Sequence, residues 1–236
     1  MKIIFSPSKE MRLKNQYLEG TKPNFEIETL KIYEKIIQLK EEEIINKFKL
    51  KNEKLVEFSE NMRNYNKQKE EIAISIYNGL SFRQLKLDTY TIDNWEYIKE
   101  NVYILSAFYG INKGTDLIKE HRLDFSIKIF DEMSLYKFWS HKIMSFFKDE
   151  EIVINLASKE YRKLIDEMKV HIIDIEFYED ENYKQISANS KKARGEMLNS
   201  IILNKIDKIE GIKKIKMKDY NYREDLSTEK KIVFMK

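Results

Sequence analysis

The stretch Ile152-Val153-Ile154-Asn155-Leu156-Ala157-Ser158 decides how this chain is expected to fold. Residues 152–156 are apolar apart from one asparagine, and this short run predicts a buried, central strand. Ser158 is a good N-cap, so a helix is expected to follow through residue 165. A strand that runs directly into a helix is typical of proteins in which helices cover a sheet.

Similar patterns recur along the chain. Apolar runs predict strands at 2–5, 102–105 and 170–177 and a hairpin within 220–234. Apolar residues spaced by three and four predict helices at 29–48, 54–65, 135–147 and 191–205, and capping-box spacing at 93–96 predicts a short one. Residues 71–79 fit a strand or a helix, and their alternating isoleucines favour a strand. The interleaved strands and helices predict a mixed α/β (α+β) fold with a central mixed sheet flanked by helices. Because no linker-like segment is present, we expect a single domain over 1–236.

The composition excludes several classes of protein. The 236 residues contain no cysteine, which excludes disulfide-linked partners, thiolate zinc sites, iron–sulfur clusters and a cysteine nucleophile. No segment approaches the length of apolar sequence that a transmembrane helix needs, and the N-terminus is too weakly apolar for a signal peptide. We therefore expect a cytoplasmic protein without a membrane partner.

The positive charge is concentrated in one segment. The formal net charge is +3, yet residues 181–218 hold ten Lys and Arg against four Asp and Glu. Such asymmetry indicates a basic face. Chance clustering in a lysine-rich chain is the alternative.

Within that segment, residues 191–197 read KKARGEM and are expected to open a helix. Cations in the first turn of a helix are unfavourable, and glycine is costly there. A bound anion would explain both: Arg194 can bind phosphate bidentately, Lys191 and Lys192 add charge, and Gly195 lets the backbone approach.

Two strand ends offer further anion sites. Ser6-Pro7-Ser8-Lys9 places hydroxyl groups and a cation after a strand, and Asn155 to Ser158 leads a strand into a helix N-terminus. A solvated turn and simple capping are the respective alternatives. The glycines at 110 and 114 give the segment from Tyr103 to Ile118 a weak likeness to a helix-hairpin-helix.

Other chemistry has little support in the sequence. His121, His141 and His171 lack the spacing of metal ligands, and neither a phosphate loop nor a nucleophile elbow is present. We therefore predict no metal and no cofactor, and we assign no catalytic residue.

Five segments occur in an order that resembles the YaaA family of bacterial peroxide-stress proteins: SPSK, LSAFYG, LYKFW, VINLAS followed by KEY, and KKARG. The resemblance runs over residues 1–234. It implies a single α/β fold of unusual topology with a positively charged cleft and a helix-hairpin-helix-like element. It also implies DNA binding and protection against hydrogen peroxide by keeping unincorporated iron low, which we expect to be indirect here. Lys113 and Gly114 replace a family Arg-Pro pair, and Asn199 stands where the family often has arginine.

We therefore expect a DNA-binding protein that contacts the phosphate backbone with little base readout. The expected phosphate contacts are Lys9, Lys191, Lys192, Arg194, Gly195, Ser6 and Ser158, supported by Lys113 and Arg122. Base or ligand contacts are expected from Tyr77, Asn78, Tyr109 and Asn155, with core packing as the alternative for the first three. The less expected alternative is an enzyme acting on a nucleic-acid base or nucleotide, with Asp116 or Asp124 as acid or base. A passive protein with a solvated lysine face remains a third hypothesis.

Overall fold

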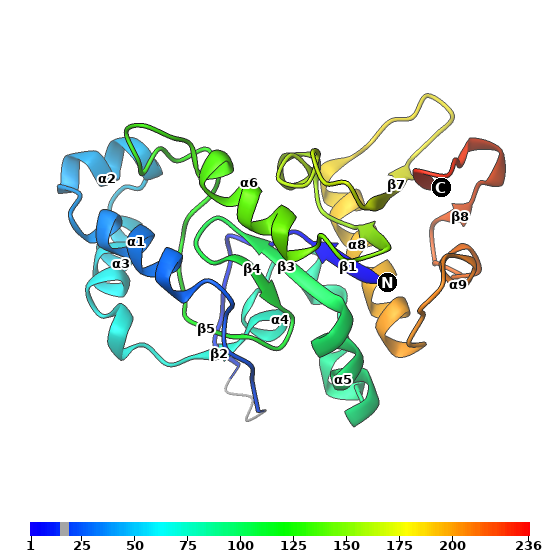
Figure 1. The fold of residues 1–236 in the computed structure, drawn as a ribbon, viewed down its shortest axis with the longest axis horizontal. Helices are drawn as coiled ribbons and strands as arrows, with labels where there is room; N and C mark the ends of the chain where they lie inside the picture. The colour runs from blue at the N-terminus through cyan, green and yellow to red at the C-terminus, as the bar shows by residue number, and fades with distance from the viewer. Residues whose placement is uncertain (15–18) are drawn as a thin grey trace.

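The computed structural model describes residues 1–14 and 19–236 and is built around one seven-stranded sheet (Figure 1). The strand order is β4-β3-β1-β6-β7-β9-β8, with the inner five strands parallel and both edge strands antiparallel. The strands are β1 (Lys2–Phe5), β3 (Val102–Ser106), β4 (Gly110–Lys113), β6 (Ile152–Asn155), β7 (His171–Tyr178), β8 (Asn221–Tyr222) and β9 (Lys231–Met235). A separate two-stranded sheet pairs β2 (Glu71–Ile72) with β5 (Leu117–Ile118). The expected mixed α/β class is confirmed, and β6 is the middle strand.

Helices cover both faces of the sheet. The α-helices are α1 (Glu26–Ile37), α2 (Glu41–Phe48), α3 (Glu53–Arg63), α4 (Ala73–Ile76), α5 (Ile92–Asn101), α6 (Leu135–Phe146), α7 (Lys159–Arg162), α8 (Ser187–Leu203) and α9 (Ile209–Lys213). Tyr103 in β3 packs on Phe146 of α6, whereas the adjacent Val102 lies towards Ile98 of α5, so α5 and α6 cover opposite faces. Helix α8 packs beside α5, and α1, α2 and α3 gather at one end of the molecule (Figure 1). Across the described residues, no helix combines the length and apolarity needed to cross a membrane.

Most of the remaining expected elements are found, with shifted ends. The helix expected over 29–48 is interrupted: α1 ends at Ile37, and Lys40 has extended backbone before α2 begins at Glu41. The Glu43 side chain accepts from Lys40 N at 3.0 Å, which caps the new helix. Helix α5 begins at Ile92, before the expected capping box, because Thr91 is its N-cap. Helix α7 is one turn long instead of reaching residue 165.

The strand favoured for residues 71–79 is wrong beyond β2. Ile72, Ile74 and Ile76 are all buried, but so are Ala73 and Ser75 between them, so the alternation does not separate two faces. The chain turns into α4 and donates Ala73 N to Asp116 O at 2.8 Å. Residues 114–116 decide this conformation, and they are distant in sequence.

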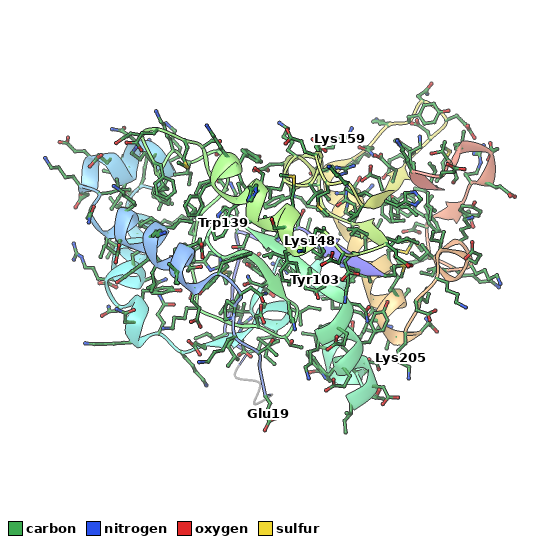
Figure 2. The ribbon with its side chains drawn as sticks, in the orientation of Figure 1. Glu19, Tyr103, Trp139, Lys148, Lys159 and Lys205 are labelled. Atoms are coloured by element: carbon green, nitrogen blue, oxygen red, sulfur yellow. The ribbon has the colours of Figure 1, made fainter. Side chains whose placement is uncertain are left out.

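The segment from residue 103 to residue 118 forms strands and contains no helix, so its weak likeness to a helix-hairpin-helix does not hold. Its tight turn joins Ser106 to Gly110, which pair across β3 and β4. Gly110 has φ +75°, a conformation that glycine adopts without strain. Trp139 of α6 is labelled in Figure 2. Its ring lies against Gly110.

Candidate functional site

Three parallel strands end close together at one edge of the sheet. Ser6 follows β1, Ser106 ends β3, and Ser158 follows β6, with β1 lying between the other two strands. The chain forms β3 on one side of β1 and later forms β6 on the opposite side of β1, so the strand order reverses here. Open sheets bind ligands at such a point, outside the carboxyl ends of the strands. The Ser6 hydroxyl accepts from Ser158 N at 2.8 Å, which ties the two strand ends together.

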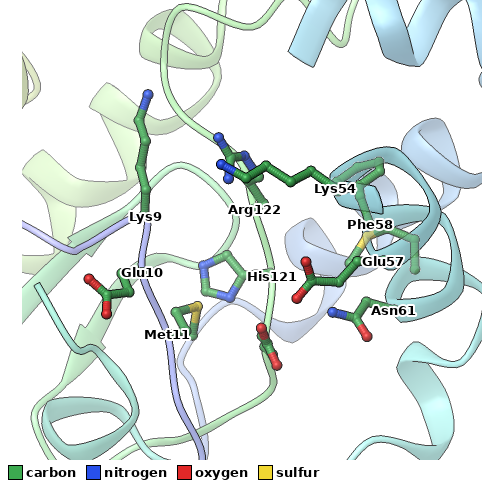
Figure 3. Close-up of a pocket in the computed structure, with 11 residues that line it drawn as sticks. Lys9, Glu10, Met11, Lys54, Glu57, Phe58, Asn61, His121 and Arg122 are labelled. Carbon is green, nitrogen blue, oxygen red and sulfur yellow. The ribbon is translucent and has the colours of Figure 1, made fainter. Parts of the chain in front are cut away.

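A cavity of about 350 Å³ lies beside this edge (Figure 3). Its walls come from the segment after β1, from α3 and from residues 120–122. A smaller cavity shares Lys9, His121 and Arg122 and includes Ser106. The two cavities therefore adjoin at these three residues, and together they make up the candidate site at the carboxyl edge.

The larger cavity has ends of opposite charge. The charged ends of Lys9, Lys54 and Arg122 lie on one side of the His121 ring in Figure 3. Below those charged ends in this view, Glu57 and Asn61 of α3 lie to the right of the ring and Glu10 lies to its left, and Glu120 also lines the wall. Burial, reinforced by repulsion from Glu57, raises the pKa of Glu120. The cavity is therefore bipolar and not uniformly basic.

Ser106 and His121 form a pair whose protonation is set by their partners. His121 Nδ1 lies 2.9 Å from Lys119 O, and a carbonyl can only accept, so Nδ1 carries the proton. The unprotonated Nε2 then faces the Ser106 hydroxyl at 3.4 Å. Burial lowers the pKa of His121 to about 4, so the ring is neutral. Ser106 Oγ also accepts from Phe108 N and Tyr109 N at 3.2 and 3.1 Å.

The carboxylates considered as acid or base lie in different places. Asp124 lines the smaller cavity and accepts from Lys9 Nζ at 2.8 Å. Burial opposes ionisation of Asp124, but the hydrogen bonds from Lys9 and Ser126 prevail and lower its pKa. Asp116 is buried elsewhere, bonded to Thr21 Oγ1 at 2.6 Å and Lys113 N at 2.7 Å. Among the described residues, no group of three His, Asp or Glu is arranged to hold a metal ion.

The structure brings together only part of the predicted site. Lys9 and Arg122 share the cavity wall, with Ser6 and Ser158 at the neighbouring strand ends. Lys113 ends β4 opposite Tyr103, near the start of β3, so it lies towards the other edge of the sheet. The prediction that Lys113 supports the same cleft is therefore wrong.

The residues predicted for base or ligand contact are engaged within the protein. Tyr77 is fully buried, and the Tyr109 hydroxyl lies 2.7 Å from that of Tyr65, so the core-packing alternative holds for both. Asn78 donates to Glu10 at 2.8 Å, and Glu10 also accepts from Arg83. Asn155 is buried and donates to Asp174 at 2.7 Å.

The KKARG segment lies inside α8, because the helix begins at Ser187 and not at Lys191. Lys191 and Lys192 are exposed, whereas Arg194 is partly buried and its Nε has no hydrogen-bond partner among the described residues. A Cβ on Gly195 would lie 2.0 Å from Ser81 O, so close helix packing accounts for this glycine. Ser81 lies against α8, and nearby in the same segment Gly79 lies against Ser8. KKARG does not line the cavity.

Several cavity residues were missed in the sequence. Lys54, Glu57 and Asn61 belong to the polar face of α3, and such faces are usually solvated. His121 was set aside because its spacing to other histidines excluded a metal site. The only sequence signal for Ser106 was its place in LSAFYG at a strand end.

Comparison with known proteins identifies the family. The model of the family described as peroxide stress protein YaaA matches residues 1–226. The chain belongs to the YaaA family. A UPF0246 protein of Fusobacterium nucleatum is 43% identical over 245 residues, covering 99% of this chain and 98% of its own. UPF0246 proteins of Finegoldia magna and Francisella philomiragia are 34% and 32% identical and cover 100% and 99% of this chain, respectively, and 98% and 99% of their own lengths. The expected YaaA membership is confirmed, and it supports a role in oxidative stress.

Proposed function

We propose that this protein binds DNA through the sugar–phosphate backbone at the carboxyl edge of its sheet, as part of its role in peroxide stress. The convergence of Lys9, Lys54 and Arg122 carries the proposal, because three separate elements bring these cations to one cavity rim (Figure 3). Lysine and arginine that neutralise phosphates release counterions and bind without regard to sequence. We therefore expect duplex binding that depends on salt and ignores base sequence.

These cations are available to an anion. Within residues 1–14 and 19–236, neither Lys54 nor Arg122 forms an ion pair with a carboxylate. Lys9 pairs with Asp124, but its side chain is 66% exposed. The Asp124 carboxylate is only 15% exposed, so it stays in place while the mobile Lys9 ammonium group can reach a phosphate as well.

A second group of cations can extend the contact with DNA. Lys191 and Lys192 are exposed on α8, and α8 packs against the segment that also touches Ser8. A backbone-binding surface uses such dispersed lysines as point charges. The link to iron implied by the family resemblance stays a proposal, and DNA protection by binding would be its indirect route.

The variant Lys9→Ala/Lys54→Ala/Arg122→Ala is expected to bind a fluorescent DNA duplex at least tenfold more weakly at low salt. The slope of log affinity against log salt should flatten by about 2 to 3 units, near 0.9 for each lost phosphate contact. Fluorescence anisotropy across a salt series measures both quantities.

The matched control is Lys99→Ala/Lys148→Ala/Lys230→Ala, which removes the same charge just before β3, β6 and β9, at the amino edge of the sheet. The control is expected to change the slope by less than one unit. If the two variants lost the same amount of affinity for the duplex, binding at the carboxyl edge would be contradicted.

The Ser106–His121 pair favours a second candidate, an enzyme acting on a nucleotide with Ser106 as nucleophile. His121 Nε2 is positioned to take the hydroxyl proton as Ser106 Oγ attacks. The N–H groups of Phe108 and Tyr109 would stabilise negative charge on Oγ.

A fluorophosphonate probe tests this candidate directly. Attack by Ser106 Oγ would form an O–P bond, release fluoride and pass the hydroxyl proton to His121. Mass spectrometry should then find the adduct on Ser106 in the wild type and none in Ser106→Ala or His121→Gln. An unlabelled Ser106 in the folded wild type would reject the enzyme and leave Ser106 as a turn-forming residue.

A further inference from the structure

We propose that the cavity beside His121 binds one nucleoside monophosphate unit, with the phosphate at its cationic end and the base at its acidic end, and that it prefers guanine. The inference rests on the proposed function, because the same cations would hold the phosphate. It adds a ligand-sized site and a base preference, neither of which backbone binding requires.

The size of the cavity limits what can enter. Its volume of about 350 Å³ is at the lower end of the range for small-molecule sites. One nucleotide fits this volume, whereas a duplex can only rest on the rim. The phosphate is then placed by Lys9, Lys54 and Arg122, whose charged ends lie together on one side of His121 (Figure 3).

Carboxylates outnumber hydrogen-bond donors at the opposite end of the cavity, where Asn61 is the neutral amide beside Glu57 and Glu120. Glu57 and Glu120 both line this wall, and burial, with repulsion from Glu57 added to it, raises the pKa of Glu120. A ligand with N–H donors would relieve that repulsion. Guanine presents two adjacent N–H donors on its pairing edge, which match the two oxygens of a carboxylate, whereas thymine presents one.

The middle of the cavity is suited to the flat faces of a base. Met11, Phe58 and the neutral His121 ring also line the cavity, and one face of that ring stacks on Phe108, which leaves the other face for a base. Aromatic and apolar side chains stack on bases without distinguishing them. Base preference must then come from the Glu57–Glu120 end.

Titration calorimetry with guanosine monophosphate, thymidine monophosphate and inorganic phosphate tests the site. We expect guanosine monophosphate to bind at least tenfold more tightly than thymidine monophosphate, and phosphate to bind most weakly. In Glu57→Gln/Glu120→Gln, affinity for guanosine monophosphate should fall at least tenfold. The control Glu53→Gln/Glu60→Gln changes two exposed carboxylates of the same helix and should bind like the wild type.

Duplex binding by the same variants separates this inference from the proposed function. Loss of two negative charges beside the rim should leave the affinity for duplex DNA unchanged or raise it. The same variant should lose affinity for guanosine monophosphate, so the two effects differ in sign. If duplex DNA fails to bind but the guanine preference holds, the proposed function fails and the nucleotide site stands. Equal affinity for the two nucleotides, or no effect of Glu57→Gln/Glu120→Gln, would overturn the inference.

The nucleotide can be free or part of a DNA strand, and a further arm distinguishes these sources. A duplex with one unpaired guanine is compared with a duplex carrying one unpaired thymine. Tighter binding of the guanine duplex assigns the site to an unpaired nucleotide of DNA. Equal binding of the two duplexes, together with tight guanosine monophosphate binding, assigns it to a free nucleotide.

Discussion

Trp139→Ala is expected to lower the free energy of unfolding by about 4 kcal/mol. Trp139 is fully buried, and its indole N–H donates to Ala107 O at 2.8 Å. Its ring also lies against Gly110 and packs on Phe25. Alanine would leave a large cavity beneath α6 and an unsatisfied carbonyl in the turn that joins β3 to β4.

Urea unfolding followed by circular dichroism measures this loss. Trp139→Phe keeps most of the ring volume but loses the indole N–H, so it should cost about 1 to 2 kcal/mol. Because Ala107 directly follows Ser106, we also expect the Ser106 hydroxyl to be positioned less firmly beside His121. A loss below 1 kcal/mol in Trp139→Ala would contradict the central role of this ring.

Gly195→Ala is expected to destabilise the protein by about 3 kcal/mol, even though alanine is the better helix former by about 1 kcal/mol. The added Cβ would lie 2.0 Å from Ser81 O and 2.7 Å from Ser81 C, which are backbone atoms that cannot rotate away. Helix α8 would have to move off the segment from Gly79 to Gln84. Thermal and urea unfolding of the variant measure the cost.

Gly211→Ala is the matched control, because the Cβ there would meet a side-chain methyl of Ile206 and no backbone. We expect it to change stability by less than about 1 kcal/mol. The comparison also tests the earlier interpretation of KKARG. If Gly195→Ala is as stable as the wild type but binds DNA less well, Gly195 serves a phosphate and not helix packing.

The sequence was most informative where a pattern was local and long. The helix from Leu135 and the strands β1, β3, β6 and β7 were predicted within one or two residues, because their apolar spacing reflects one buried face. Prediction failed over residues 71–79, where every residue from Ile72 to Tyr77 is buried, so periodicity carries no information. Within 103–118 the strand β3 was predicted, but the weak likeness to a helix-hairpin-helix was not found, because two glycines are compatible with more than one kind of turn.

The candidate site was predicted only where it coincides with strand ends. Ser6, Lys9 and Ser158 were found because carboxyl ends of neighbouring parallel strands meet at one edge. The partners of Lys9 in the cavity wall come from α3 and from residues 120–122, far along the chain. No local pattern marks Lys54 or Glu57 among the many charged residues that face solvent on helices.

Family, fold class and most strands follow from the chain read alone, because short motifs and apolar periodicity are properties of neighbouring residues. The strand order, the position of KKARG inside α8 and the bipolar cavity were decided by packing. Side chains 45 to 113 residues apart, from Lys9 to Lys54 and Arg122, meet only because the sheet places β1 between β3 and β6 and α3 packs beside that edge. Such proximity depends on long-range contacts, which residue spacing does not encode.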